Sequence, residues 1–395
     1  MIGAISALSY WACYFARNIL GVMTPQIVEK TSITVEFIGT LSTANMLSYA
    51  VGQLVNGIIG DKVKAKYLVS GGLCFAGIGI AVVGKASSDI VMMIAYSLVG
   101  FFLSMLYAPL VKLISENTYP THAIRCCLGL SFASLLGAPT AGAVALIFDW
   151  KSAFAVCGMT IALIGAVFFL AVHSFEKHGV VKYRERKIAK EKNRGVRALM
   201  EHEIVKYSFV SVLTGIVRTS VVFWIPTYLS QYLGFSAGIS ATIFTVMSCA
   251  QAASPYINNL LFYERVLKRN RNAALLFSFT MSAMGFAMMF IVKNPIVNIV
   301  FIIVALVMNS GAADLLWSVY CPSLRETGMV SSATGYLDFL SYMAAAVANL
   351  LFANAISIIG WGKLILVWAG LMSAGAMISL PWKNLNCIAE KRKNH

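Results

Sequence analysis

The sequence predicts an all-α membrane protein with twelve transmembrane helices in two pseudo-symmetric bundles of six. Three observations carry this prediction: an apolar composition, regularly spaced apolar runs, and basic charge that alternates between successive loops. Of the 395 residues, 59% are hydrophobic and 12% are charged, whereas a typical soluble chain has about a quarter charged. With a mean hydropathy of +0.77, much of the chain is expected to face lipid.

The apolar runs have the length that a bilayer requires, about 20 residues for one helix. We expect spans at 2–24, 36–60, 67–85, 89–114, 125–148, 151–172, 204–230, 237–263, 272–292, 295–320, 328–356 and 360–381. Met1 leads directly into the first run, without a basic segment or a small-residue cleavage site. We therefore expect no removable signal peptide and a first helix that is retained.

The loops differ in basic charge from one side to the other. Three lysines follow the second span, a long basic stretch separates the sixth from the seventh, and the opposite loops hold one lysine each. Because cytoplasmic loops are enriched in Lys and Arg, we expect both termini in the cytoplasm and a multi-pass protein of the cell membrane, with the bacterial inner membrane favoured. The net charge of +15 lies in these loops, which predicts contact with the lipid bilayer and no nucleic-acid partner.

The chain is expected to be duplicated. We predict a six-helix bundle at 1–173, a basic cytoplasmic linker at 174–203, and a second bundle with a short cytoplasmic tail at 204–395. Arg17 in the first span and Arg218 in the seventh occupy matching places in the two halves. Transporters built from repeats bind substrate near the bilayer midplane between them. We expect a monomer, since each chain would hold a complete cavity.

Arg17 and Arg218 are the candidate substrate ligands. An arginine at the centre of a membrane helix costs about 2.5–3.5 kcal/mol on insertion scales, so its retention suggests a use. Its guanidinium binds phosphate or carboxylate in a bidentate manner and stays charged. The pair predicts a doubly charged anion held between the halves, and the alternative is structural ion pairs with Asp314 or Asp338.

Polar and aromatic side chains accompany the arginines at helical spacing. Tyr10 and Tyr14 share one face of the first helix with Arg17, because residues three, four and seven apart align. Further candidates are Tyr49 and Gln53 on the second helix and Asp338 and Tyr342 on the eleventh. Each tyrosine is either a phosphate donor or a packing residue.

A loop motif follows the second helix. In GIIGDKVKAK, residues Gly57, Asp61 and Lys62 match the loop signature of major facilitators, while Lys64 replaces a later Gly. The glycine permits close helix contact, and the aspartate can cap a neighbouring helix. The motif predicts conformational gating and no contact with substrate.

Four segments resemble the organophosphate:phosphate antiporter family of the major facilitator superfamily, which includes bacterial glycerol-3-phosphate and hexose-phosphate transporters. They are YWACYFARN with Arg17, Tyr49 before the loop motif, WIPTYL after Arg218, and GYLDFLSYMAAAVAN with Tyr342. The resemblance implies a rocker-switch exchanger that binds inorganic phosphate or a phosphorylated metabolite between Arg17 and Arg218.

The chain departs from that family at four positions. Gln53 stands where the family has a lysine, Ser134 where it has a histidine, Asn18 where it has a basic residue, and Ser248 where it has an acid. The resemblance places Gln53 and Ser134 in the substrate site. The reduced charge leaves the substrate open between a sugar phosphate, another phospho-acid and a sulfonate.

Two other functions remain open. A proton-coupled symporter would use Asp314 or Asp338 as its proton site, and a transporter-like membrane sensor would bind a phosphorylated sugar without bulk transport. An enzyme is not expected, because the sequence contains no nucleophile–base set and no phosphate-cradling Gly-rich loop after a strand. We likewise expect no cofactor and no metal site.

Overall fold

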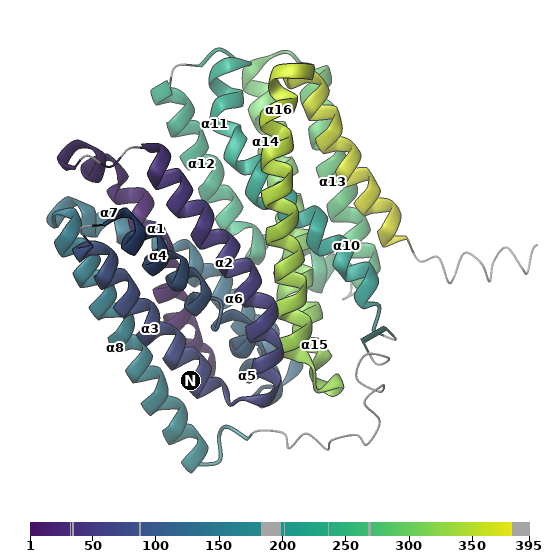
Figure 1. Cartoon of the computed structure of the whole chain (residues 1–395). Coiled ribbons are helices and arrows are strands. Elements are labelled where there is room, and N and C mark those ends of the chain that lie inside the picture. The colour runs from purple at the N-terminus through teal and green to yellow at the C-terminus, as the bar shows by residue number, and fades with distance from the viewer. Residues whose placement is uncertain are drawn as a thin grey trace, which may run out of the picture. The chain divides into compact units, whose positions relative to one another are not determined.

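The computed structural model describes residues 1–395 except 32, 34, 87, 183–198, 201, 236, 268–269 and 381–395. In this part of the chain, the regular structure is helical, without a strand (Figure 1). Helical segments cover each predicted span, two of them interrupted and the last two merged in one helix, which agrees with the all-α prediction. The predicted linker and tail fall largely on 183–198 and 381–395, outside the described residues, and the predicted boundaries of the halves stay predictions.

Eight helical runs among the described residues are long and apolar enough to cross a membrane. The helices outside this set include α1, α2, α12 and the first part of α16. These carry most of the polar and aromatic side chains that the sequence nominates for the site. Helices that face a cavity are expected to be the less apolar ones.

The chain forms two compact units, and each is described by itself. The first comprises Met1–Ile204 and Trp317–Met343. It contains α1 (Ile2–Lys30), α2 (Val35–Lys62), α3 (Ala65–Lys85), α4 (Asp89–Leu103), α5 (Tyr107–Asn117), α6 (Pro120–Leu135), α7 (Gly137–Ile147), α8 (Trp150–Lys177), most of η3 (Leu315–Tyr320), α15 (Cys321–Ser323), η4 (Leu324–Thr327) and the first turns of α16 (Val330–Ser379).

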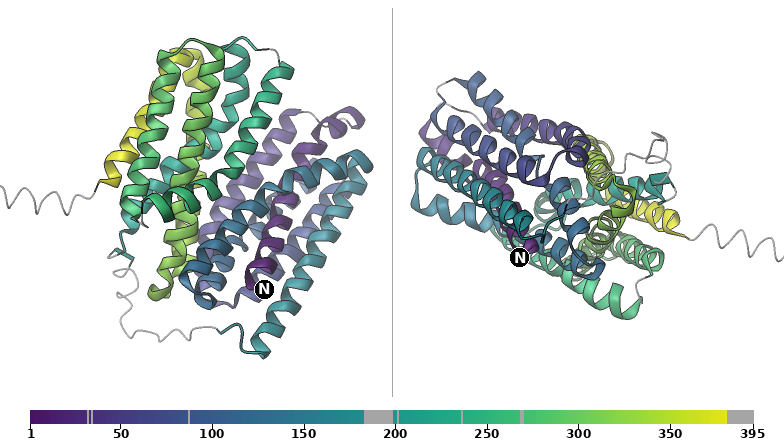
Figure 2. Two further views of the ribbon diagram at one scale, coloured as in Figure 1. Left: turned by 180° about the vertical axis from the view of Figure 1, so that it is seen from behind. Right: turned by 90° about the horizontal axis from the view of Figure 1, so that it is seen from below.

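Close packing of small residues joins α3 and α8, which lie side by side in the first unit (Figures 1 and 2). A Cβ added at Gly77 would lie 2.5 Å from the carbonyl oxygen of Gly158, and one at Gly158 would lie 2.5 Å from that of Gly77. Small residues at such contacts let membrane helices approach closely, because lipid supplies no hydrophobic drive to associate.

Two predicted spans are each broken into two helices. The span at 89–114 divides between α4 and α5, and the span at 125–148 divides at Leu136. Each break comes a few residues before a proline, Pro109 in α5 and Pro139 in α7. Proline lacks the N–H of the helical ladder and clashes with the carbonyl four residues earlier, so a helix is tolerated only where the proline falls in its first turn.

The second unit comprises Val205–Leu316 and Ala344–His395. It contains α10 (Ile204–Gly215), η1 (Ile216–Val221), α11 (Val222–Gln231), α12 (Ala237–Tyr256), η2 (Ile257–Val266), α13 (Arg271–Ile291), α14 (Pro295–Asp314) and the remainder of α16. Gly360 has a φ of 75° and marks the turn between the last two predicted spans. The segments η1, η2 and η3 are π-helical, a local widening that is frequent at functional sites.

Candidate substrate site

Arg17, on α1 in the first unit, lies within a cluster of aromatic rings. Its guanidinium carbon is 4.4 Å from the ring centre of Tyr49, 5.1 Å from Tyr14 and 5.3 Å from Tyr342. Its Nη1 donates a hydrogen bond of 3.0 Å to the Tyr342 hydroxyl. Among the described residues Arg17 forms no ion pair, so the structural pairing with Asp338 is not made. The rings hold the cation through their quadrupoles and leave its charge available to an anion.

Tyr10 lies behind this cluster. Its ring is 5.1 Å from that of Tyr14 and 5.2 Å from that of Tyr107, and the Tyr107 ring is 5.7 Å from that of Trp317. Tyr10 is buried, whereas Tyr14 is half-buried. The helical spacing therefore aligns Tyr10, Tyr14 and Arg17 as predicted, with Tyr10 supporting Tyr14 through ring packing.

The α2–α16 seam is the contact between one face of α2 and the first turns of α16, both within the first unit. It is formed by Tyr49, Gln53, Gly57 and Asp61 on α2 and by Ser331, Gly335, Asp338 and Tyr342 on α16.

Three contacts set the register of this seam. Asp61 meets the first residues of α16, Gly57 lies against Gly335, and the Tyr49 and Tyr342 rings are 5.2 Å apart. A Cβ added at Gly57 would lie 2.9 Å from the Ser331 carbonyl oxygen and 3.0 Å from the Gly335 Cα. As residue numbers fall along α2 they rise along α16, so the two helices run antiparallel.

Asp61 accepts hydrogen bonds from the backbone N–H groups of Ser331 at 3.0 Å and Ser332 at 2.9 Å. Lys112, on α5, reinforces this end of the seam. Its Nζ donates to the backbone oxygens of Gly60 at 3.0 Å and Asp61 at 2.9 Å, and it lies 4.0 Å from the Asp61 carboxylate. Lys112 was not among the residues predicted for this motif, although it is a basic residue in a helix that ends on the same side as Asp61.

Gln53 and Asp338 lie in the middle of the seam. Gln53 is 0% exposed, and neither its Nε2 nor its Oε1 has a hydrogen-bond partner. Asp338 is 8% exposed and interacts electrostatically with Tyr49. Both are therefore polar groups in a closed part of the protein, one turn along the helices from the aromatic cluster.

The other nominated residues of the first unit lie apart from this chemistry. The Ser134 hydroxyl, on α6, donates to the Ser131 carbonyl at 2.6 Å, a bond within its own helix. Lys62 is exposed at the end of α2. The structure thus brings Tyr14, Tyr49 and Tyr342 to Arg17 but ties up Ser134 locally.

Arg218 belongs to the second unit and lies in the π-helical segment η1. Its side chain is exposed and interacts electrostatically with Asp314, a buried residue at the end of α14. On the same helix Asn309 is 0% exposed with both amide atoms unpartnered, and Ser310 accepts a hydrogen bond of 3.2 Å from Gln251. Since the units are described separately, the pairing of Arg17 with Arg218 stays a prediction.

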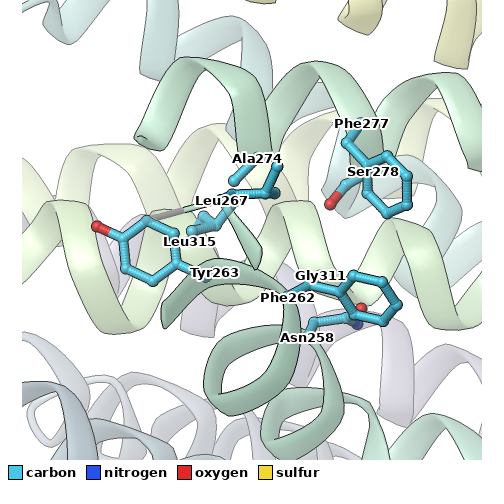
Figure 3. A pocket seen from close by; sticks show the side chains of 9 residues that line it. All are labelled: Asn258, Phe262, Tyr263, Leu267, Ala274, Phe277, Ser278, Gly311 and Leu315. Atoms are coloured by element: carbon cyan, nitrogen blue, oxygen red, sulfur yellow. The ribbon is translucent and has the colours of Figure 1, made fainter. Parts of the chain in front are cut away.

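A small pocket lies elsewhere in the second unit, between η2, α13 and α14 (Figure 3). It is lined by Asn258, Phe262, Tyr263, Leu267, Ala274, Phe277, Ser278, Gly311 and Leu315. Its volume of about 10 Å³ is close to that of a single water site. It is too small for a metabolite and has no charged lining. Over the described residues, no group of three His, Cys, Asp or Glu is placed to hold a metal.

Comparison with known proteins gives a family match over most of the chain. The model of the Major Facilitator Superfamily matches residues 6–349. The phosphoglycerate transporter protein of Salmonella typhimurium is 23% identical, over 98% of this chain and 89% of that protein. Membrane sensor protein UhpC of Escherichia coli is 21% identical, over 95% of this chain and 90% of that protein.

A solved structure supports the same fold. The proton:xylose symporter XylE bound to 6-bromo-6-deoxy-D-glucose matches with a TM-score of 0.72 at 12% identity, covering 97% of this chain and 94% of that one. At this identity the likeness concerns the fold alone.

Proposed function

Because the chain belongs to the major facilitator superfamily, we propose that it exchanges a small organic phosphate or similar anion for inorganic phosphate by alternating access. Family membership makes it a multi-pass membrane transporter rather than an enzyme. The transported anion, the exchange and the site residues are the proposed part.

One observation carries the proposal: Arg17 is held by aromatic rings and a tyrosine hydroxyl, and among the described residues it forms no ion pair. A guanidinium that is fixed in position and not neutralised can bind a tetrahedral oxyanion, which accepts hydrogen bonds from its paired N–H donors. Tyr342 and Tyr14 add hydroxyl donors next to it. The name of one relative, a phosphoglycerate transporter, supports the same substrate class.

The proposal includes a second ligand, Arg218, and a location. Arg218 would bind the anion from the second half. We further propose a monomer in the cell membrane with both termini in the cytoplasm, where the basic linker at 174–203 would face anionic lipid.

Phosphate exchange in proteoliposomes tests the proposal. Wild type, Arg17→Lys and Arg218→Lys are reconstituted with internal phosphate, and uptake of labelled phosphate is followed. We expect both variants to lose at least tenfold in exchange, because lysine keeps the charge but lacks the bidentate fork. Arg125→Lys, an exposed arginine on α6, is the matched control and should exchange like wild type. No exchange by wild type under any internal anion would refute the proposal.

Two observations favour alternative functions, a proton symporter and a sensor. Uptake measurements in the same proteoliposomes distinguish them from the exchanger. Asp314 is buried and its Oδ2 has no hydrogen-bond partner, which favours a proton site. Uptake driven by a proton gradient without internal anion would indicate a symporter. The sensor relative favours signalling, and ligand binding without either form of uptake would indicate a sensor.

A further inference from the structure

The unpartnered amide of Gln53 lies at the centre of the α2–α16 seam. The side chain is 0% exposed, and both Nε2 and Oε1 lack hydrogen-bond partners. Burying both amide atoms without partners is costly, and most buried polar groups in folded proteins are paired. An unpaired amide in this closely packed seam therefore indicates a group that is satisfied in another state of the transport cycle.

The register of the seam places Asp338 opposite this amide. Gly335 lies against the Gln53 backbone, so closely that a Cβ on Gly335 would collide with the Gln53 carbonyl oxygen. Tyr342 lies against Tyr49. Asp338 follows Gly335 by three residues and precedes Tyr342 by four, so all three share one face of α16. The layer next to the aromatic cluster therefore consists of an amide and a carboxylate.

These two side chains have a defined chemical preference. An amide offers both donors and an acceptor, while an ionised carboxylate only accepts. An alcohol hydroxyl can accept from Gln53 Nε2 and donate to Asp338. A second carboxylate on the ligand has no proton to donate, and Asp338 repels it.

The distance between the Gln53 layer and the Tyr49 layer matches the length of a small phosphate ester. Four residues along a helix correspond to about 6 Å, which separates the Gln53 layer from the Tyr49 layer that holds Arg17. This length is close to the span from a phosphorus atom to a hydroxyl on the second or third carbon of a phosphate ester. Phosphate at Arg17 and a hydroxyl at Gln53 can therefore belong to one small molecule.

We infer that Gln53 and Asp338 form a subsite for the uncharged, hydroxylated end of a phosphate monoester whose phosphate binds Arg17. The inference rests on the anion exchange proposed above and narrows its substrate to a polyol or sugar phosphate, in preference to a phosphorylated acid with a free carboxylate. A ligand hydroxyl that enters when the seam opens would supply the partners that Gln53 lacks in the closed seam.

Competition against labelled phosphate exchange tests the subsite. Glycerol 3-phosphate and 3-phosphoglycerate serve as probes, because they differ in charge at the end remote from the phosphate. In wild type we expect glycerol 3-phosphate to compete at least tenfold more strongly. Gln53→Met should reduce that preference about tenfold by removing the amide, and Asp338→Asn should reduce it by strengthening competition from 3-phosphoglycerate. Gln231→Met, an exposed glutamine at the end of α11, should leave the preference unchanged.

The outcomes separate the subsite from the proposed function. Equal competition by the two probes in wild type, or a preference unaffected by both variants, would overturn the subsite while the exchange stands. No phosphate exchange by wild type would overturn the proposed function instead. The rise in unfolding temperature on adding each probe in detergent gives the same comparison. It requires no transport, so the ligand preference of an inactive variant can still be measured.

Discussion

Asp61 at the end of α2 accepts a 3.0 Å hydrogen bond from the backbone N–H of Ser331 at the start of α16. Its other carboxylate oxygen accepts from the next N–H, at 2.9 Å. The first N–H groups of a helix have no partner within the helix, and this end carries partial positive charge. A carboxylate from one helix therefore caps another that is far away in the sequence and closes one end of the α2–α16 seam.

Asp61→Asn should loosen this closure. The amide keeps one acceptor but turns a donor toward a backbone N–H and removes the charge at the helix end. We expect a loss of about 1–3 kcal/mol in stability of the closed state and a fall of about tenfold in exchange. Thermal unfolding in detergent and phosphate exchange measure the two effects. Asp89→Asn, at an exposed first turn of α4, is the control, and identical behaviour of the two variants would contradict the prediction.

Gly335→Ala should hold the seam apart. A Cβ at this position would collide with the backbone of Gln53 and lie 2.8 Å from the Gly57 Cα, and backbone cannot move aside as a side chain can. We expect exchange to fall at least tenfold. Gly129→Ala adds the same methyl group where no atom of a packing neighbour lies within 4 Å, and it should retain activity. Full exchange by Gly335→Ala would show that the close approach is dispensable.

Tyr49→Leu should weaken anion binding through Arg17. The Tyr49 ring centre lies 4.4 Å from the guanidinium carbon, and such contacts contribute about 0.5–2 kcal/mol. We expect the half-saturating phosphate concentration to rise several-fold to about tenfold, because the cation loses its position. Tyr49→Phe preserves the ring and should remain within about twofold of wild type. If the phenylalanine variant fails as badly as the leucine variant, the hydroxyl and not the ring is the important group.

Lys66→Met should destabilise the first unit without a direct effect on the site. Lys66 Nζ lies 2.5 Å from Glu176 Oε2 between α3 and α8, and the side chains are 4% and 16% exposed. Removing one partner of a buried pair costs about 3–5 kcal/mol when the other charge is left uncompensated, and we expect a smaller loss here because Lys64 still lies near Glu176. Lys64→Met is the control, since Lys64 is 51% exposed and lies 3.8 Å from the same carboxylate, where a pair contributes about 0–1 kcal/mol. Equal melting temperatures for the two variants would contradict the prediction.

Several features of the site were predictable from local sequence. Tyr10, Tyr14 and Arg17 are adjacent on one helix, so their spacing alone aligns them. Gly57 and Asp61 belong to one loop motif whose chemistry is a close contact and a cap. Other features had no local signal: the partners of Asp61 lie on α16, Lys112 comes from α5, and the Ser134 hydroxyl donates to a carbonyl of its own helix.

By itself the sequence determined the membrane character, the helical runs and the two arginines, because hydropathy, length and the cost of a charge in lipid are properties of local segments. Only the tertiary structure decided which side chains surround Arg17, that no ion pair neutralises it among the described residues, and that Gln53 is buried without a hydrogen-bond partner beside Gly335. These relations depend on the register between α2 and α16. That register follows from glycine contacts and a helix cap between segments far apart in the chain, and no periodicity within either segment encodes it.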